Sequence, residues 1–270
     1  MPSRDFMLCG GVRGTGGFDP LLLAERIEPL VAPWRGGVQL RRYARFRWSR
    51  HYGGNVAGDV IGCNLRCAFC WAWRFAFRAT GGELLEPASA ARRLIRTARG
   101  KPVYVARLTG GEPTIGWSHL IDLAARVVRN MPSTVFVVET NGILIGAGRV
   151  DPLELVSRAG RGRVFFRVSI KAAEPETFGK VTGAAPWALD LQLRALEKLA
   201  EAGLEPGRDY RPALVVGLDP PEAVARLLER IASIDPRLPG EVEPEVLTLY
   251  PHARLELGRR GLKPRVYREP

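Results

Sequence analysis

The chain has 270 residues, of which 46% are hydrophobic and 25% are charged, an ordinary composition for a globular protein with one full core. Its 40 basic residues outnumber 28 acidic ones, so the net charge is +12, and we weigh nucleic acid as a partner against a basic surface that is only solvated. No apolar run reaches the ~20 residues of a membrane helix, and residues 1–17 lack the apolar core of a signal peptide, so we expect a cytoplasmic protein without a membrane partner.

Residues 1–52 are expected to extend a larger core. The glycine-rich stretch 10–17 lacks the preceding strand and the Lys-Ser/Thr ending of a phosphate loop. Asp19 and Pro20 predict a helix from 20 to about 30. In the next segment, Arg45 and Arg47 alternate with Phe46 and Trp48. This pattern suits nucleic acid, through phosphate contacts and base stacking, or an edge strand with one packed face, and we favour the edge strand.

From residue 56 onward, apolar segments alternate with helical patterns. The expected strands are 56–61, 103–108, 135–138, 163–170, 213–218 and 246–249, and the expected helices are 87–98, 117–129, 188–202 and 221–233. Six strands with helices between them predict an α/β fold whose parallel sheet is open or partly closed into a barrel. We expect this core to span 53–250 and to be followed by a short tail, 251–270.

Three cysteines, Cys63, Cys67 and Cys70, lie in one loop directly after the first of these strands. Thiolates so close in sequence converge on one metal centre with little loss of chain entropy. Three of them are one short of the four that complete a structural zinc site or a four-iron cluster, so one metal position stays open unless a distant residue supplies the fourth ligand. The remaining cysteine, Cys9, is interpreted as a free thiol, and His51 as a hydrogen-bonding residue.

The spacing Cys-x-x-x-Cys-x-x-Cys, with Phe69 before the last cysteine, resembles the cluster loop of the radical S-adenosylmethionine (SAM) enzymes. A second motif, Gly110-Gly111-Glu112-Pro113, follows the second strand and resembles that family's second signature. The resemblance implies a partial (β/α)6 barrel and a [4Fe-4S] cluster on the three cysteines, with SAM on the free iron. An electron from a donor such as ferredoxin or flavodoxin then cleaves SAM, and the resulting 5′-deoxyadenosyl radical abstracts hydrogen from a substrate.

Polar residues end the predicted strands, where active sites of parallel barrels gather: Glu112, Thr140, Asn141, Ser169 and Lys171. By resemblance, the Gly110-Gly111 backbone approaches the methionine part of SAM, Glu112 or nearby backbone carbonyls accept from its ammonium group, and Phe69 contacts its adenine. Ser169, Thr140 and Asn141 are expected at the ribose hydroxyls, and Lys171 at the carboxylate. A purely structural role is the alternative for Ser169 and Lys171.

The substrate is less constrained than the cofactor. The motif pattern and Thr140-Asn141-Gly142 look like the pyruvate formate-lyase activating enzyme branch, which makes a glycyl radical on a partner protein. That branch has Asp-x-Lys after the fourth strand, whereas this chain has Ser169-Ile170-Lys171. We place a small-molecule or protein substrate ahead of tRNA, the substrate of wybutosine-pathway radical SAM enzymes. The non-enzymatic alternative is a zinc-bearing, nucleic-acid-binding module with Cys9 or His51 as the fourth ligand.

Overall fold

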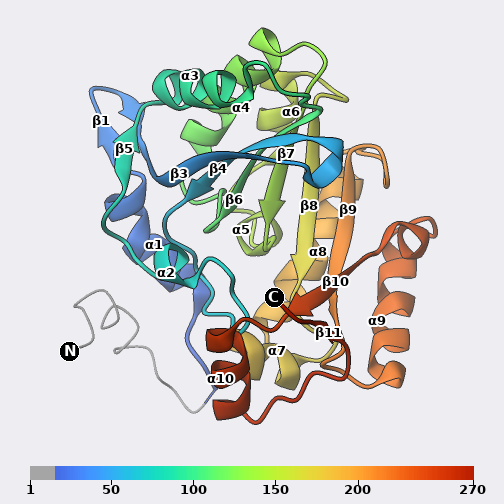
Figure 1. The fold of residues 1–270 in the computed structure, drawn as a ribbon. Helices are drawn as coiled ribbons and strands as arrows, with labels where there is room; N and C mark the ends of the chain where they lie inside the picture. The colour runs from blue at the N-terminus through green and yellow to red at the C-terminus, as the bar shows by residue number, and fades with distance from the viewer. Residues whose placement is uncertain (1–15) are drawn as a thin grey trace.

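The computed structural model describes residues 16–270, which form one nine-stranded sheet and a two-stranded ribbon (Figure 1). The strand order is β11-β10-β9-β8-β7-β6-β4-β3-β5. Six neighbouring strands are parallel: β4 (Asn55–Val60), β6 (Val105–Gly110), β7 (Val135–Thr140), β8 (Val164–Ile170), β9 (Tyr210–Val216) and β10 (Glu243–Thr248). The predicted α/β fold with a mostly parallel sheet is confirmed. Cys9 and most of the glycine-rich stretch lie outside the described residues.

Strands from both ends of the chain complete the sheet. β3 (Arg41–Ser49) pairs antiparallel with β4, and β5 (Glu83–Leu85) pairs antiparallel with the start of β3. The second half of β3 therefore has one free edge, as the alternation of arginine and aromatic residues predicts. β11 (Tyr267–Arg268) adds a parallel strand beside β10, so the predicted tail is part of the sheet. β1 (Trp34–Arg35) and β2 (Val38–Gln39) form the separate ribbon.

Most of the helices that connect the parallel strands lie along the outer face of a curved sheet (Figure 1). They are α3 (Pro87–Ala98), α4 (Trp117–Asn130), α6 (Pro152–Ala159), α8 (Ala188–Glu201) and α9 (Pro221–Ile234). The helices α5 (Ile143–Gly146) and α7 (Pro175–Thr182) follow the carboxyl ends of β7 and β8, and the short turn η3 (Leu238–Glu241) precedes β10. α1 (Pro20–Val31), η2 (His51–Gly53), α2 (Trp73–Ala76) and α10 (Pro251–Arg259) lie outside this series. As predicted, Asp19 caps α1, because its side chain accepts from the backbone N–H groups of Leu21 and Leu22.

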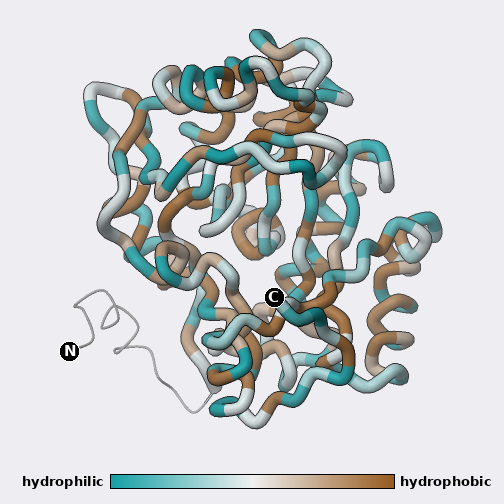
Figure 2. Tube along the Cα trace, viewed as in Figure 1, coloured by the Kyte–Doolittle hydropathy of each residue, from teal (hydrophilic) through white to brown (hydrophobic). Residues whose placement is uncertain are grey.

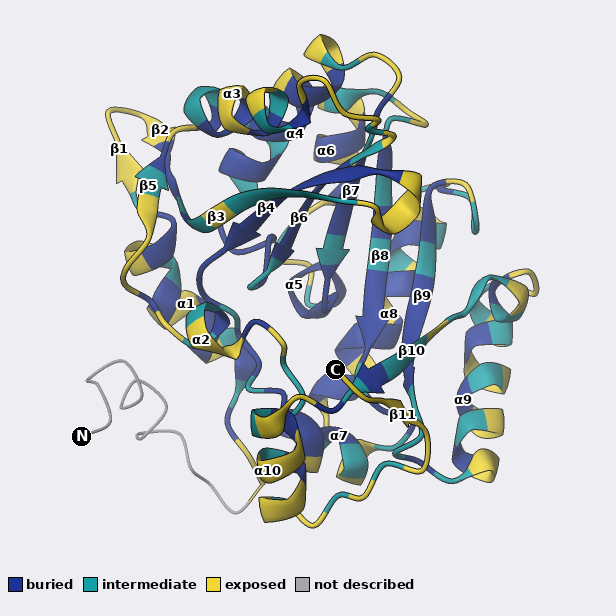
Figure 3. Ribbon diagram, viewed as in Figure 1, coloured by how far each residue is buried: buried dark blue, intermediate teal, exposed yellow. Residues whose placement is uncertain are grey.

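The core lies between the sheet and these outer helices. In α4 the buried residues Leu120, Leu123, Ala124 and Val127 recur at helical spacing, so one stripe faces the sheet. In β8 alternate residues such as Phe166 and Val168 are buried beneath the helices. Figure 2 shows the apolar residues along the strands, and Figure 3 shows the same strands as the most buried part of the fold. The other face of each strand is therefore free to carry polar side chains.

Several boundaries differ from the sequence prediction. The second parallel strand begins at Val105 rather than at 103, and β9 and β10 both begin three residues before their predicted starts. The start of β10 was missed because its first half, Glu243-Pro244-Glu245, has the composition of a loop. No helix among residues 16–270 is long and apolar enough to span a membrane.

Candidate functional site

The cysteine loop joins β4 to α2 and is fastened to the C-terminal half of the chain. The backbone N–H groups of Arg66 and Ala68 donate to the carbonyls of Thr182 and Val181, at 3.0 and 2.8 Å. Nε2 of His252, in α10, donates to the Cys70 carbonyl at 2.8 Å. Residues 251–270 therefore help to shape the cysteine loop, which their interpretation as a simple tail did not anticipate.

All three cysteines are free thiols, and they line one cavity of about 250 Å³ at the carboxyl ends of the parallel strands. Of the other predicted site residues, Phe69, Glu112, Thr140, Asn141, Ser169 and Lys171 line the same cavity. The chain thus brings together residues from four loops at one end of the sheet, as the parallel topology predicts.

Burial controls the chemistry of these thiols. It raises the pKa of Cys63 to about 12, with the Glu112 carboxylate as a second cause, and it also raises the pKa of Cys67 and Cys70. The thiols are therefore neutral until a metal displaces their protons. Three sulfur donors around one cavity form a soft ligand set that fits an iron–sulfur cluster. Among residues 16–270, no three His, Cys, Asp or Glu side chains lie close enough to hold a single metal ion, so the three thiols share the cavity without converging on one metal position. A [4Fe-4S] cluster does not require this, because each thiolate binds a different iron.

Glu112 connects the ends of β6 and β7. Glu112 is only 1% exposed, and its carboxylate accepts hydrogen bonds from Thr140 Oγ1 at 2.7 Å and from the Asn141 N–H at 2.8 Å. It also accepts from the backbone N–H and hydroxyl of Thr114. Both oxygens thus have protein partners. The expected contact of Glu112 with the SAM ammonium group remains a prediction.

Gly110 and Gly111 are required by the protein itself. A Cβ on Gly110, which has φ +91°, would lie 2.6 Å from the Phe75 ring, and one on Gly111 would lie 2.2 Å from the Gly62 carbonyl oxygen. The turn after β6 therefore packs directly against the start of the cysteine loop. This packing is a different reason for glycine from the one expected, a close approach to SAM, which stays a prediction.

Replacing Gly111 with alanine is expected to lower the free energy of unfolding by about 2 kcal/mol, because the Cβ forces two backbone segments apart. Denaturant unfolding of the metal-free protein measures this loss. Gly240→Ala is the matched control, since its Cβ would meet no atom within 4 Å. Equal stability of the two variants would contradict the packing described above.

Gln192, in α8, holds the ends of β7 and β8 together. Its Nε2 donates to the carbonyls of Asn141 and Ser169, at 2.7 and 2.8 Å, and its Oε1 accepts from the Lys171 N–H at 3.0 Å. Asn141 in turn donates through Nδ2 to Asn64 Oδ1, in the cysteine loop, at 2.7 Å. The one signal for Gln192 in the sequence is its position as a polar residue within the apolar stripe of α8.

Arg41 is a second positioning residue that the sequence did not reveal. It is fully buried, and burial lowers its pKa to about 10. Its guanidinium donates to the Ile61 carbonyl, just before the cysteine loop, at 2.6 Å and to the Glu112 carbonyl at 3.0 Å. It therefore joins the two motifs on which the cofactor expectation rests.

Lys171 and Ser169 face β10 at the mouth of the cavity. Lys171 Nζ lies 3.9 Å from the Glu245 carboxylate and 5.8 Å from the centroid of the Phe69 ring. The Ser169 hydroxyl accepts from Arg167 at 3.2 Å. Both side chains border the cavity, which keeps a ligand role open for each, and their predicted contacts with SAM remain predictions.

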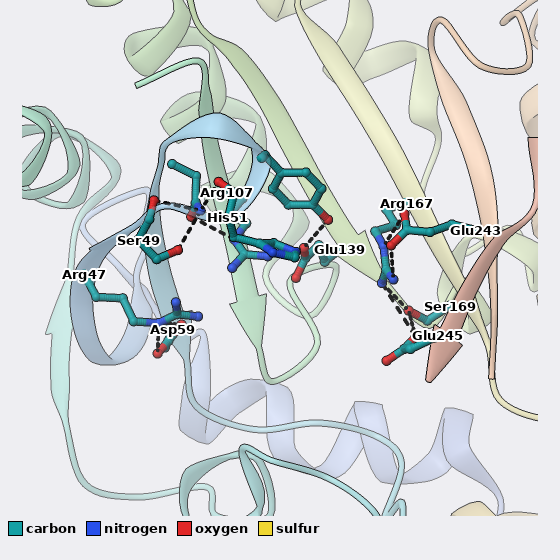
Figure 4. Close-up of polar contacts among 12 residues, drawn as sticks. Arg47, Ser49, His51, Asp59, Arg107, Glu139, Arg167, Ser169, Glu243 and Glu245 are labelled. Carbon is teal, nitrogen blue, oxygen red and sulfur yellow. Dashed lines mark hydrogen bonds and ion pairs between the residues drawn. The ribbon is translucent and has the colours of Figure 1, made fainter. Parts of the chain in front are cut away.

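The inner face of the sheet carries charged residues in pairs (Figure 4). Arg107 donates to Glu139, and Arg167 donates to Glu243 at 2.9 and 3.1 Å. Asp59 accepts from Arg45 at 2.6 Å and from Arg47 at 3.0 Å. Sequence reasoning missed most of this set. The available signal was a charge in the middle of otherwise apolar strands, as at Arg107, Glu139 and Arg167.

His51 is not placed to complete a metal site with the cysteines. It precedes β4 in η2, whereas Cys63 follows the opposite end of the same strand, and six strand residues span roughly 16 Å. Its carbonyl accepts from Asn55, and burial lowers the pKa of its imidazole. The zinc module with His51 as fourth ligand is therefore wrong. Cys9, the other proposed ligand, lies outside the described residues.

Residues 60–231 match the family described as the Radical SAM superfamily, and the chain belongs to this family. The members of this family are enzymes that use a [4Fe-4S] cluster and SAM. The alternative of a non-enzymatic, zinc-bearing, nucleic-acid-binding module is therefore set aside. The chain is 34% identical over 171 residues to GTP 3′,8-cyclase of Paenarthrobacter nicotinovorans, covering 61% of this chain and 44% of that relative. It is 30% identical over 161 residues to "Probable GTP 3′,8-cyclase" of Methanosarcina acetivorans, covering 57% and 45%.

The chain thus spans less than half the length of these curated relatives. Among solved structures, it resembles TYW1 with a lysine-pyruvate adduct bound, with a TM-score of 0.44 and 15% identity over 66% of this chain and 61% of that one. It also resembles Streptococcus suis SuiB bound to S-adenosylmethionine, with a TM-score of 0.47 and 18% identity over 64% of this chain and 36% of that one.

Proposed function

We propose that Cys63, Cys67 and Cys70 hold the [4Fe-4S] cluster and that the enzyme abstracts a hydrogen atom from a ribonucleotide, free or within RNA. When bound, the cluster and SAM supply a 5′-deoxyadenosyl radical. The observation that supports the cluster ligands is the single cavity that all three free thiols line. A ferredoxin or flavodoxin is the proposed electron donor, and the cytoplasm, where thiols stay reduced, is the proposed compartment.

The paired charges on the inner face of the sheet support a polar substrate. An apolar substrate would exclude water from the pairs Arg107–Glu139 and Arg167–Glu243 without offering them any new partner. A ribonucleotide instead presents hydroxyls, a phosphate and base edges to such groups. The two curated relatives above are named for a reaction of GTP, which also favours a nucleotide. Neither observation favours the glycyl-radical activase branch.

Transfer of deuterium tests this proposal. The anaerobically reconstituted protein is incubated with dithionite, SAM and either ribose-deuterated GTP or bulk tRNA grown in deuterated medium. We expect 5′-deoxyadenosine that is one mass unit heavier with at least one of the two substrates, and none from the Cys67→Ala variant. Unlabelled 5′-deoxyadenosine with both substrates would reject the nucleotide and leave the cofactor chemistry in place.

A further inference from the structure

Two arginines and a tryptophan form a group at the edge of the cavity, and no part of the SAM chemistry uses them. Trp71 directly follows Cys70, is 43% exposed, and lines the cavity that holds the three thiols. Arg45 and Arg47 reach it from β3, with guanidinium carbons 6.0 and 5.3 Å from the centroid of its ring. Residues 26 positions apart in sequence, such as Arg45 and Trp71, are thus joined into one surface.

Asp59 binds the Nε atom of each arginine. Its carboxylate is fully buried and accepts from Nε of Arg45 at 2.6 Å and Nε of Arg47 at 3.0 Å. The terminal nitrogens of both guanidinium groups donate no hydrogen bond to the residues that the structure describes. One carboxylate against two cations leaves a net charge of +1. The arrangement therefore fixes two guanidinium groups in place and leaves their donors available to an anion.

The tryptophan is held in position from behind. The Trp71 and Phe75 rings pack in a T-shaped arrangement, with centroids 5.8 Å apart and planes at 76°. Phe75 in turn fills the space that a Cβ on Gly110 would occupy. An exposed indole that is braced on one side and flanked by cations offers a π surface to a flat partner.

We propose that Arg45, Arg47 and Trp71 form a nucleotide-binding subsite, in which the two guanidinium groups bind a 5′-phosphate and the indole stacks on the attached base. Phosphate oxygens match the free guanidinium donors and complete the charge around Asp59. Stacking on an aromatic side chain is the usual way to hold an unpaired base. The inference rests on the proposed function, since it names how the proposed nucleotide substrate is held.

The test measures binding of GMP, guanosine, ribose 5-phosphate and bulk tRNA to the anaerobic holoenzyme by calorimetry. We expect Trp71→Leu to weaken GMP about tenfold and to leave ribose 5-phosphate unchanged, and Trp71→Phe to stay close to wild type. The double variant Arg45→Lys/Arg47→Lys keeps the charges beside Asp59 but loses the forked donors. It is expected to weaken GMP and ribose 5-phosphate about tenfold and to leave guanosine unchanged.

The matched controls are Trp34→Leu, which replaces an exposed tryptophan in β1, and Arg96→Gln, which replaces an exposed arginine in α3. Both variants are expected to bind GMP like the wild type. Much tighter binding of tRNA than of GMP, with the same dependence on Trp71, would identify RNA as the source of the nucleotide.

Three results would overturn the subsite. The first is GMP and tRNA binding that neither the tryptophan nor the arginine variant changes; deuterium transfer from a nucleotide would then still support the proposed function. The second is a loss of SAM affinity in Trp71→Leu with GMP affinity unchanged, which would assign the indole to the cofactor. The third is a wild-type protein that binds neither GMP nor tRNA, which would reject the nucleotide substrate as well.

Discussion

Replacing Cys67 with alanine is expected to remove the iron–sulfur cluster and to lower 5′-deoxyadenosine formation below detection. Two thiolates cannot hold a cluster that needs three protein ligands and a free iron for SAM. Cys63, Cys67 and Cys70 are the only cysteines among residues 16–270, and all three line the cavity as proposed ligands. No other described cysteine can therefore replace Cys67. Iron and sulfide analysis, visible absorbance and product chromatography measure the effect.

Cys9→Ala is the matched control for this substitution. We interpret Cys9 as a free thiol, so this variant is expected to retain iron, sulfide and product formation at wild-type levels. A Cys67→Ala protein that keeps its cluster, or a Cys9→Ala protein that loses it, would show that the ligand set is wrong.

Replacing Glu112 with alanine is expected to lower the free energy of unfolding by about 4 kcal/mol. The substitution leaves the Thr140 hydroxyl and the Asn141 N–H buried without their acceptor, and each such group costs about 1–3 kcal/mol. Glu112→Gln keeps the shape and part of the hydrogen bonding, so a loss of about 2 kcal/mol is expected. Urea unfolding of the metal-free protein measures both values.

Glu112→Ala is also expected to weaken SAM binding by about 10- to 100-fold, because it loosens the turns that carry Gly111 and Asn141. Glu176→Gln, which removes an exposed ion pair with Lys180, is the control and is expected to change stability by less than about 1 kcal/mol. If Glu112→Gln lost SAM affinity at unchanged stability, a direct contact with SAM would replace the bracing role.

The sequence could predict that most of the candidate site residues share one cavity, because local patterns carry that information. Three cysteines within eight residues need no tertiary structure to be found together. Glu112, Thr140 and Ser169 follow from a general property of parallel sheets, whose carboxyl ends meet at one edge. A sequence-based assignment that places the strands correctly also shows which residues end them. Small errors at the opposite ends of the strands, as at Val105, do not change which residues are expected in the site.

The inner charges and the braces could not be predicted in the same way. Arg41 serves Ile61 and Glu112, which are 20 and 71 positions away, and the pairing of Arg167 with Glu243 spans 76 positions. Burial of an arginine becomes understandable only when its carbonyl partners are known. The first half of β10 was missed for a related reason, since Glu243 and Glu245 are polar because they face Arg167.

The most direct test of the cofactor chemistry is 5′-deoxyadenosine formation by the wild-type protein, reconstituted without oxygen and supplied with dithionite and SAM. The cavity of three thiols and the membership of the Radical SAM superfamily predict a brown protein that contains iron and sulfide and forms this product. A colourless protein that contains zinc without iron and forms no 5′-deoxyadenosine would show that the three cysteines do not hold an iron–sulfur cluster.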